Sequence, residues 1–254
     1  MKYNIREFWK TGSSVCLLAA FLTLPAHAEE LVFNTQDFAP FSFLSGENVK
    51  GPAATIISRV CEAEKFDCAF RLLPWKRAQT EVRNGQANAM FVIGRNAERE
   101  EWLHFSPAII TTEYGFFVQK TNPVVYETIK DIRGFTVGVY GPSNTSRSLE
   151  KIRDELGDLT IEMKANDEGG FRKLSLGRVD AVFSNRDVGN GLVARLGLKN
   201  IRYAGAQRSL NYFIGFSKAH NDTDVVKRFN SRLKDLVSDG SINKILSTYN
   251  MTLR

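Results

Sequence analysis

The chain has 254 residues, of which 43% are hydrophobic and 24% are charged, and its formal net charge is +6. The apolar content is enough for a folded core, and the length suits one large domain or two smaller ones. The basic residues are scattered along the sequence, whereas nucleic-acid binding needs denser basic patches, so we exclude nucleic acid as a partner.

The first 28 residues have the organisation of a secretory signal peptide. Lys2, Arg6 and Lys10 precede an apolar run at 15–24, and an A-x-A motif ends at Ala28. The run is about ten residues long, which is too short to cross a bilayer core of about 30 Å as a helix. A retained membrane anchor is the alternative. We expect cleavage after Ala28 and export of the chain to the periplasm.

The residues that follow predict a β-α-β-α-β unit. Ile56, Ile57 and Val60 have helical spacing, and Gly85 ends a second helix. In chain order, the predicted elements are a strand at 31–33, a helix at 51–64, a strand at 68–73, a helix at 79–84 and a strand at 87–93. This order implies an α/β fold with a mainly parallel sheet and helices on its faces.

The same order of elements occurs again further along, without a repeat of sequence. The predicted elements are a strand at 135–141, helices at 143–156 and 168–176, and strands at 159–163, 179–183 and 201–203. Two helices, at 222–238 and 241–249, end the chain.

Two extended stretches, 111–120 and 210–218, lie on either side of this second unit and are rich in β-branched and aromatic residues. A chain that enters and leaves a unit through two strands is typical of two lobes on a hinge. We therefore predict that residues 29–112 and 213–254 form lobe 1 and that residues 113–212 form lobe 2.

Cys61 and Cys68 are the cysteines that remain after residue 28. An even pair in an exported chain indicates a disulfide, and closing so short a loop stabilises the fold by about 2 kcal/mol. A metal site is the alternative, but His104 and His220 are distant in sequence and lack ligand spacing. We expect a disulfide, no metal and no cofactor.

Five motifs together resemble a known family across the whole chain after residue 28. They are FAPFSF (38–43), Trp75 with VRNGQANAMF (82–91), ER followed by FSPAI (98–109), GFTVGVYGPSNTS (134–146) and LSLGRVDAVFSN (174–185). In this order and spacing they resemble the type II periplasmic solute-binding proteins of polar amino-acid ABC importers, the bacterial extracellular solute-binding proteins of family 3. The resemblance implies two α/β lobes that close on a small ligand, and docking of the closed form on a permease in the inner membrane. We expect the protein to be a monomer.

The stretch LPWKRA (73–78) places Trp75 and Arg77 directly after a predicted strand. Ligands bind beyond the carboxyl ends of the strands in open parallel sheets, so both side chains are expected in a cleft. Phe38 follows the first strand and is expected on the opposite wall. The resemblance implies an aromatic side chain at Phe38 and at Trp75, whereas packing into the core is the alternative for both.

Arg99 is the residue to which the resemblance assigns the ligand carboxylate. A guanidinium forms two parallel bonds with a carboxylate, and each is roughly twice as strong as a neutral hydrogen bond. The alternative is a surface arginine paired with Glu98 or Glu101.

Gly94 and Arg95 lie just before Arg99. Family members often have Ser or Thr just before this arginine, where this chain has Val92 and Gly94. We expect Gly94 and Arg95 to line the cleft. Arg77 and Arg95 together would suit an acidic ligand with two carboxylates, whereas surface ion pairs worth about 0–1 kcal/mol are the alternative.

In lobe 2, GPSNTSR (141–147) follows a predicted strand and begins a helix, where backbone N–H groups attract anions. We expect Tyr140, Ser143, Asn144 and Thr145 to contact the ligand, and the resemblance places a ligand-contacting Ser or Thr in this turn. Helix capping is the alternative for one of them.

Asn185 occupies the position where many family members have an Asp that pairs with the ligand ammonium. An uncharged amide pairs poorly with a buried ammonium, so a ligand without an amine stays open. Asp187, two residues further on, is the alternative partner, and we expect both residues at the site.

The sequence favours a non-catalytic binding protein that delivers its ligand to an ABC importer. An enzyme of the same fold, such as a prephenate or arogenate dehydratase, would need an acid with a raised pKa in the cleft. Glu113, Glu168 and Asp187 are the candidates, but none has a recognisable catalytic setting. A ligand-sensing module for a membrane receptor is the third hypothesis.

Overall fold

The computed structural model describes residue 1 and residues 29–253, so residues 2–28, on which the signal-peptide prediction rests, lie outside the described part. The strands are β1 (Glu30–Thr35), β2 (Phe43–Ser45), β3 (Asn48–Lys50), β4 (Asp67–Leu72), β5 (Ala89–Ile93), β6 (Leu103–Phe105), β7 (Ile110–Gln119), β8 (Thr136–Tyr140), β9 (Thr160–Lys164), β10 (Ala181–Asn185) and β11 (Ile201–Ser217).

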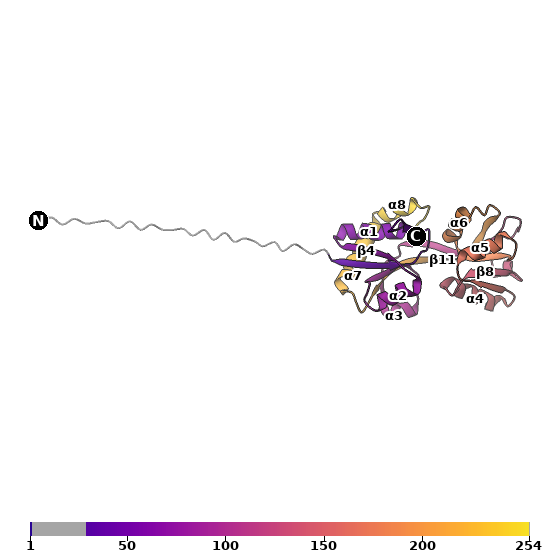
Figure 1. Ribbon diagram of the computed structural model, residues 1–254, viewed down its shortest axis with the longest axis horizontal. Coiled ribbons are helices and arrows are strands. Elements are labelled where there is room, and N and C mark those ends of the chain that lie inside the picture. The colour runs from indigo at the N-terminus through magenta and orange to yellow at the C-terminus, as the bar shows by residue number, and fades with distance from the viewer. Residues whose placement is uncertain (2–28, 254) are drawn as a thin grey trace.

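The helices alternate with these strands through most of the chain, as the sequence predicts. They are α1 (Pro52–Glu64), α2 (Trp75–Arg83), α3 (Ala97–Trp102), the 3-10 turn η1 (Ile129–Ile132), α4 (Asn144–Leu156), α5 (Asp167–Ser175), α6 (Arg186–Arg195), α7 (Thr223–Ser238) and α8 (Ser241–Ser247). Figure 1 shows α1–α3, α7 and α8 in one body and α4–α6 in a second, with β11 running between the two. We call the first body lobe 1 and the second lobe 2.

The main sheet runs through both lobes in the order β4-β1-β5-β11-β7-β10-β8-β9, and β6 also pairs with β11. Neighbouring strands within each lobe are parallel where helices connect them, as in the pairs β1–β4, β1–β5, β8–β9 and β8–β10. Parallel strands direct their carboxyl ends to the same edge of the sheet, and in each lobe this arrangement gathers the loops that follow the strands.

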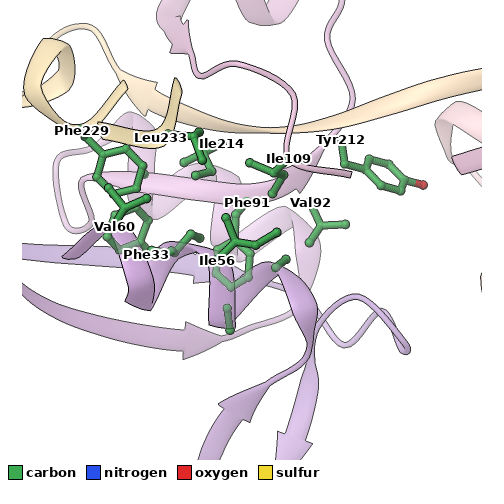
Figure 2. Packing of buried hydrophobic residues seen from close by; sticks show 14 of the residues in the cluster. Phe33, Ile56, Val60, Phe91, Val92, Ile109, Tyr212, Ile214, Phe229 and Leu233 are labelled. Carbon is green, nitrogen blue, oxygen red and sulfur yellow. The ribbon is translucent and has the colours of Figure 1, made fainter. Parts of the chain in front are cut away.

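Helices cover both faces of the sheet in lobe 1. Phe33 of β1 is fully buried, and its ring centroid lies 5.8 Å from that of Phe70 and 5.7 Å from that of Phe229 in α7. Figure 2 shows Phe33 among side chains from α1, α7 and the strands of this lobe. A smaller cluster around Val82 and Met90 packs α2 against the opposite face. Burying each such side chain contributes about 1.5–3 kcal/mol.

Lobe 2 has the same three layers. Phe116 and Phe183, whose ring centroids are 4.8 Å apart, pack with the side of the sheet covered by α4. Phe117 faces the other side, where its ring centroid lies 5.0 Å from that of Phe171 in α5. Successive residues of β7 therefore serve the two faces of the sheet, as the alternation of a strand requires.

The long strands β7 and β11 connect the lobes. They are antiparallel, and their pairing extends from Ile201 opposite Gln119 to Tyr212 opposite Ile110. From Phe213 onward, β11 pairs with β5 instead. Two lobes joined by two crossing strands were predicted, and the fold confirms this. The residues at which one lobe passes into the other, expected at 112/113 and 212/213, stay a prediction.

Some predicted elements were wrong in extent. The stretches 201–203 and 210–218, expected as separate strands, belong to the single strand β11. Its pairing shifts register twice between Tyr203 and Arg208, and this interrupts the regular alternation on which the prediction depended. Helix α2 begins at Trp75 rather than at residue 79, which places LPWKRA at a helix start.

The predicted disulfide is confirmed. Cys61 near the end of α1 is bonded to Cys68 at the start of β4, with a Cα–Cα distance of 6.3 Å. The bond fixes the turn between the first helix and the edge strand of lobe 1. No helix in the described part of the chain combines the length and hydropathy needed to span a membrane.

Candidate functional site

A cavity of about 300 Å³ lies between the lobes, and its walls come from both of them and from β7 and β11. Lobe 1 contributes residues at or after the carboxyl ends of β1, β4 and β5, and lobe 2 contributes residues at or after the carboxyl ends of β8, β9 and β10. The lining residues are Gln36, Phe38, Trp75, Gln79, Val92, Gly94, Asn96, Glu98, Arg99, Tyr114, Tyr140, Pro142, Ser143, Asn144, Thr145, Arg147, Asp167, Ser184, Asn185 and Tyr212.

Arg99 is the buried cation of this cavity. It belongs to α3, whose first turn is capped by Asn96 Oδ1, and only 7% of the residue is exposed. Its Nη1 donates to the carbonyl of Gly94 at 2.7 Å, and no ion pair within the described residues joins the guanidinium to a carboxylate. Burial, and next the neighbouring Arg147, lower the pKa of Arg99. A buried cation without a counterion favours an anionic ligand, because the ligand compensates the lost hydration.

Trp75 lies beside Arg99 in the cavity. The guanidinium carbon of Arg99 is 5.7 Å from the centroid of the Trp75 ring, a cation–π geometry. Phe38 lines the same cavity and packs edge-on against Tyr212 at 5.9 Å between ring centroids. Phe41, in contrast, is fully buried in the core of lobe 1. The cavity thus combines aromatic surfaces with a fixed positive charge.

The start of α4 faces the cavity from lobe 2. Ser143 caps the helix: its Oγ accepts from Ser146 N at 3.1 Å and donates to the Tyr140 carbonyl at 2.7 Å. Arg147 N makes the first helical bond, to Ser143 O, so the N–H groups of Asn144 and Thr145 precede the hydrogen-bonded turns. Such free N–H groups and the helix dipole favour an anion.

Gly94 lies where the lobes approach each other. A Cβ atom at this position would be 3.3 Å from Nδ2 of Asn144 in lobe 2 and 3.9 Å from Nη1 of Arg99. Val92, two residues earlier, has a left-handed backbone with φ of 58°, which costs a β-branched residue about 1–3 kcal/mol. The backbone at the end of β5 therefore has a strained conformation and leaves little space between Gly94 and the opposite lobe.

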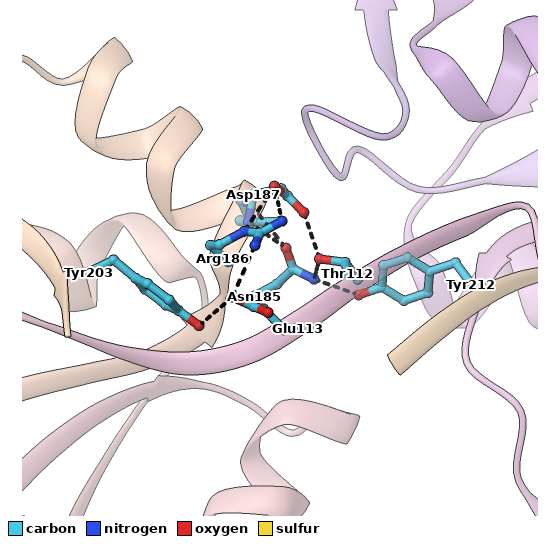
Figure 3. Close-up of polar contacts among 8 residues, drawn as sticks. Thr112, Glu113, Asn185, Arg186, Asp187, Tyr203 and Tyr212 are labelled. Carbon is cyan, nitrogen blue, oxygen red and sulfur yellow. Dashed lines mark hydrogen bonds and ion pairs between the residues drawn. The ribbon is translucent and has the colours of Figure 1, made fainter. Parts of the chain in front are cut away.

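Asn185 lies at the cavity, but its polar atoms are already bonded (Figure 3). Its Nδ2 donates to Thr112 Oγ1 at 3.0 Å and to the Tyr212 hydroxyl at 3.3 Å, and its Oδ1 accepts from the N–H groups of Asp187 and Val188. These bonds connect β7, β11 and the start of α6. Asn185 thus holds the lobe junction, and no donor or acceptor of its side chain is left over.

Asp167, the first residue of α5, lines the cavity and was not among the predicted site residues. Its Oδ1 accepts from Ser184 Oγ at 2.8 Å. Burial raises the pKa of Asp167 to about 6, and the Ser184 bond opposes the rise only in part. The position directly after β9 fits the same rule of strand ends that predicted Trp75.

Nine of the twelve predicted ligand-binding residues line this cavity, and three do not. The nine are Phe38, Trp75, Gly94, Arg99, Tyr140, Ser143, Asn144, Thr145 and Asn185. Arg77 is 67% exposed and pairs with Glu81 at 2.8 Å, while Arg95 pairs with Glu100 and lines a separate cavity. Asp187 accepts from Thr112 Oγ1 at 2.6 Å. For these three, a ligand contact stays a prediction that their present bonds do not support.

Several lining residues were not predicted from the sequence. The predicted hinge strands provide Tyr114 and Tyr212, and loops or helix starts provide Gln36 and Arg147. Tyr114 and Tyr212 come from stretches read only as connections between lobes. Two strands that cross between lobes necessarily pass the floor of a cleft, and this reasoning would have found both tyrosines.

The two α/β lobes, the paired crossing strands and the cavity between the lobes define a type II periplasmic binding protein fold. The chain matches the model of the bacterial extracellular solute-binding proteins, family 3, over residues 31–252, and it belongs to this family. The predicted family is thereby confirmed.

Individual relatives are distant. The chain is 23% identical over 213 residues to the probable amino-acid-binding protein YxeM of Bacillus subtilis, covering 83% of this chain and 79% of that protein. A histidine kinase sensor domain with similarity to periplasmic binding proteins superposes with a TM-score of 0.77 at 17% identity, covering 89% of this chain and 99% of the domain. An ancestral arginine-binding protein bound to arginine superposes with a TM-score of 0.73 at 20% identity, covering 87% of this chain and 97% of that protein. Likenesses at these identities show the shared fold.

Proposed function

We propose that the protein captures a small carboxylate-bearing ligand, an amino acid or a related organic acid, between its lobes and delivers it to an ABC importer. The observation that carries this proposal is Arg99, a buried guanidinium in a cavity between two hinged lobes with no carboxylate partner in the described residues. An arginine in this state has free donors in a planar fork, which matches a carboxylate.

The remaining ligand contacts follow from the lining. Trp75 and Phe38 pack on the apolar part of the ligand, and the start of α4, at Ser143–Thr145, adds backbone N–H donors to its negative end. The relatives support this assignment, since YxeM is described as a probable amino-acid-binding protein and the ancestral protein was solved with arginine.

The location and partners belong to the same proposal. Export through residues 1–28, cleaved after Ala28, places a monomer in the periplasm, where the closed lobes dock on a permease in the inner membrane. The family consists of extracellular binding proteins, which supports both the location and a role without catalysis.

A thermal-shift screen over amino acids, dicarboxylates, sugars and cyclic acids tests the proposal. A ligand at a hundred times its Kd adds about 2.7 kcal/mol, which raises Tm by roughly 5–10 °C in a chain of this size. We expect shifts with carboxylates that Arg99→Gln removes and that Arg95→Gln, an exposed arginine paired with Glu100, retains. Sugars shifting Tm while carboxylates do not would contradict the proposal.

An enzyme on the same fold is the second candidate, and Asp167 is the observation that favours it. A carboxyl group with a pKa of about 6 in the cavity has the property that a dehydratase acid needs. Glu113 and Asp187, two of the acids proposed from the sequence, are instead paired with Arg186 and do not line the cavity. Mass spectrometry of the bound compound distinguishes the candidates, since a binder returns its ligand unchanged and a dehydratase releases water and carbon dioxide.

Sensing is supported by one neighbour, the histidine kinase sensor domain of the same fold. A sensing role keeps the same cavity and replaces the permease by a membrane receptor. Uptake of the ligand by cells that lack only this protein distinguishes transport from sensing. Uptake is lost if the protein delivers its ligand to an importer, and it is retained if the protein only signals to a receptor.

A further inference from the structure

The cavity contains two carboxylates, and their environments differ. Glu98 is exposed, with 76% of its side chain accessible, and it pairs with Arg83 at 3.2 Å. Asp167 is half-buried, and no ion pair reaches it from the described residues. Its Oδ1 accepts from Ser184, whereas no hydrogen bond from the described part of the chain reaches Oδ2. Asp167 therefore has an oxygen available for a ligand.

We propose that Asp167 binds a positively charged group of the ligand, so that the cavity selects molecules with both a carboxylate and a cation. This inference rests on the proposed function, because it assumes that Arg99 holds the carboxylate of the same molecule. It makes Asp167 a specificity-determining residue that discriminates amino acids from plain organic acids.

The other candidate partners for a cation are already engaged. Asn185 uses both amide hydrogens and its carbonyl within the lobe junction. Asp187 bonds to Thr112 and pairs with Arg186, and it does not line the cavity. A cation in the cavity thus finds its negative partner at Asp167, at the start of α5.

The raised pKa of Asp167 is consistent with a carboxyl group that lacks a cationic partner in the ligand-free protein. Burial raises its pKa to about 6, and an adjacent cation would lower the pKa again by favouring the ionised form. The charged and titratable groups that line cavities with Asp167 are Glu98, Arg99, Tyr114, Tyr140, Arg147 and Tyr212 on one side, and Asp37, Glu168, Arg172 and Arg195 on the other.

Asp167 also borders a second, more open cavity of about 990 Å³, together with Gln36, Phe38 and Tyr140. The cationic group that Asp167 binds can therefore occupy either of two positions in the ligand. It is an ammonium on the carbon next to the carboxylate, or it is a charged group at the far end of a chain that extends toward the second cavity.

Four six-carbon acids test the proposal and separate these sources. Hexanoate has no amine, L-norleucine has one beside the carboxylate, 6-aminohexanoate has one at the far end, and L-lysine has both. Their Kd values are measured by calorimetry at pH 7.5 for the wild type, for Asp167→Asn and for Glu98→Gln. The asparagine keeps the shape of the side chain and an acceptor for Ser184, and circular dichroism checks the fold.

We expect the wild type to bind at least one aminated acid about tenfold or more tighter than hexanoate, as a charge-assisted bond implies. Asp167→Asn reduces that preference to within about twofold, while Glu98→Gln keeps the preference. A preference for L-norleucine shows that Asp167 binds the ammonium next to the carboxylate, and a preference for 6-aminohexanoate shows that it binds a cation at the far end of the ligand.

The inference is overturned if the wild type shows no preference for any amine, if it binds none of the four acids, or if Asp167→Asn keeps the preference. Product formation from any probe overturns it as well. Failure of the proposed function has a different signature, since Arg99→Gln would then leave the binding of all the acids unchanged.

Discussion

Asp167 and Glu168 are neighbours in sequence, yet their surroundings shift their pKa values in opposite directions. Burial raises the pKa of Asp167 to about 6, whereas the hydrogen bond from Arg172 lowers the pKa of Glu168. One residue at the start of α5 faces the cavity, and the next faces the arginines of α5 and α6. The difference marks which of the two is available to a ligand.

This contrast predicts the pH dependence of stability in the ligand-free protein. Because the folded pKa of Asp167 is raised, the folded state binds more protons than the unfolded state between about pH 4 and pH 6, and stability falls as the pH rises through that range. Asp167→Asn should therefore unfold at higher urea concentration than the wild type at pH 7, and the two midpoints should converge near pH 4.

Glu168→Gln serves as the control, because its lowered pKa predicts the opposite sign and a loss of stability at pH 7. If the urea midpoint of Asp167→Asn at pH 7 is equal to or below that of the wild type, the ionised Asp167 carboxylate does not lower the stability of the folded state, and the prediction is wrong.

At the level of single residues, the sequence predicted most of the cavity, because side chains that directly follow parallel strands meet at one edge. Arg77 could not be placed in this way. The helix starts at Trp75, so the side chain two residues later rotates away and pairs with Glu81 one turn further along. The start of a helix decides such positions: the sequence predicts the helix only from residue 79, whereas in the structure Pro74 is the cap of a helix that begins at Trp75.

At the level of elements, the long connecting strand and two helices were the hardest to predict. Helix α6 contains two glycines in RDVGNGLVAR, which lower its helix propensity, and α3 has only six residues. In β11, Gly205 has a φ of 155° and lies so close to Tyr126 O that a Cβ would be 2.3 Å from it. Tertiary contacts hold these segments, and no local pattern shows them.

Closure of the lobes around β5 and α4 gives a prediction for Gly94. Gly94→Ala places a methyl group 3.3 Å from Asn144 Nδ2, a contact so tight that the Asn144 side chain or the lobes must move by a few tenths of an ångström. Such overpacking costs about 1–3 kcal/mol, and we expect ligand affinity to fall by about tenfold or more in calorimetry.

Gly191→Ala is the matched control, because its Cβ would be 4.0 Å from Pro40 Cδ of the other lobe, an ordinary contact. Unchanged affinity in Gly94→Ala, or an equal loss in both variants, would mean that the approach of Gly94 to Asn144 is unrelated to ligand capture.

At the level of the whole molecule, each lobe has its own core, and polar bonds join the lobes at the crossing. Thr112 of β7 and Tyr212 of β11 both accept from Asn185, and Glu113 pairs with Arg186 at 3.1 Å (Figure 3). Val188 of α6 also packs into the core of lobe 1. Apart from this contact, a hinge of two strands permits movement that leaves the core of each lobe intact, which suits opening and closing on a ligand.

On the proposed function, the cleft between the lobes holds the ligand carboxylate at Arg99. Calorimetry with the best carboxylate from the screen and with its methyl ester, on the wild type and on Arg99→Gln, tests the claim most directly. We predict that the wild type binds the acid about tenfold to a hundredfold tighter than the ester, and that Arg99→Gln binds the two within about twofold of each other. Undiminished discrimination of acid from ester in Arg99→Gln would contradict the account.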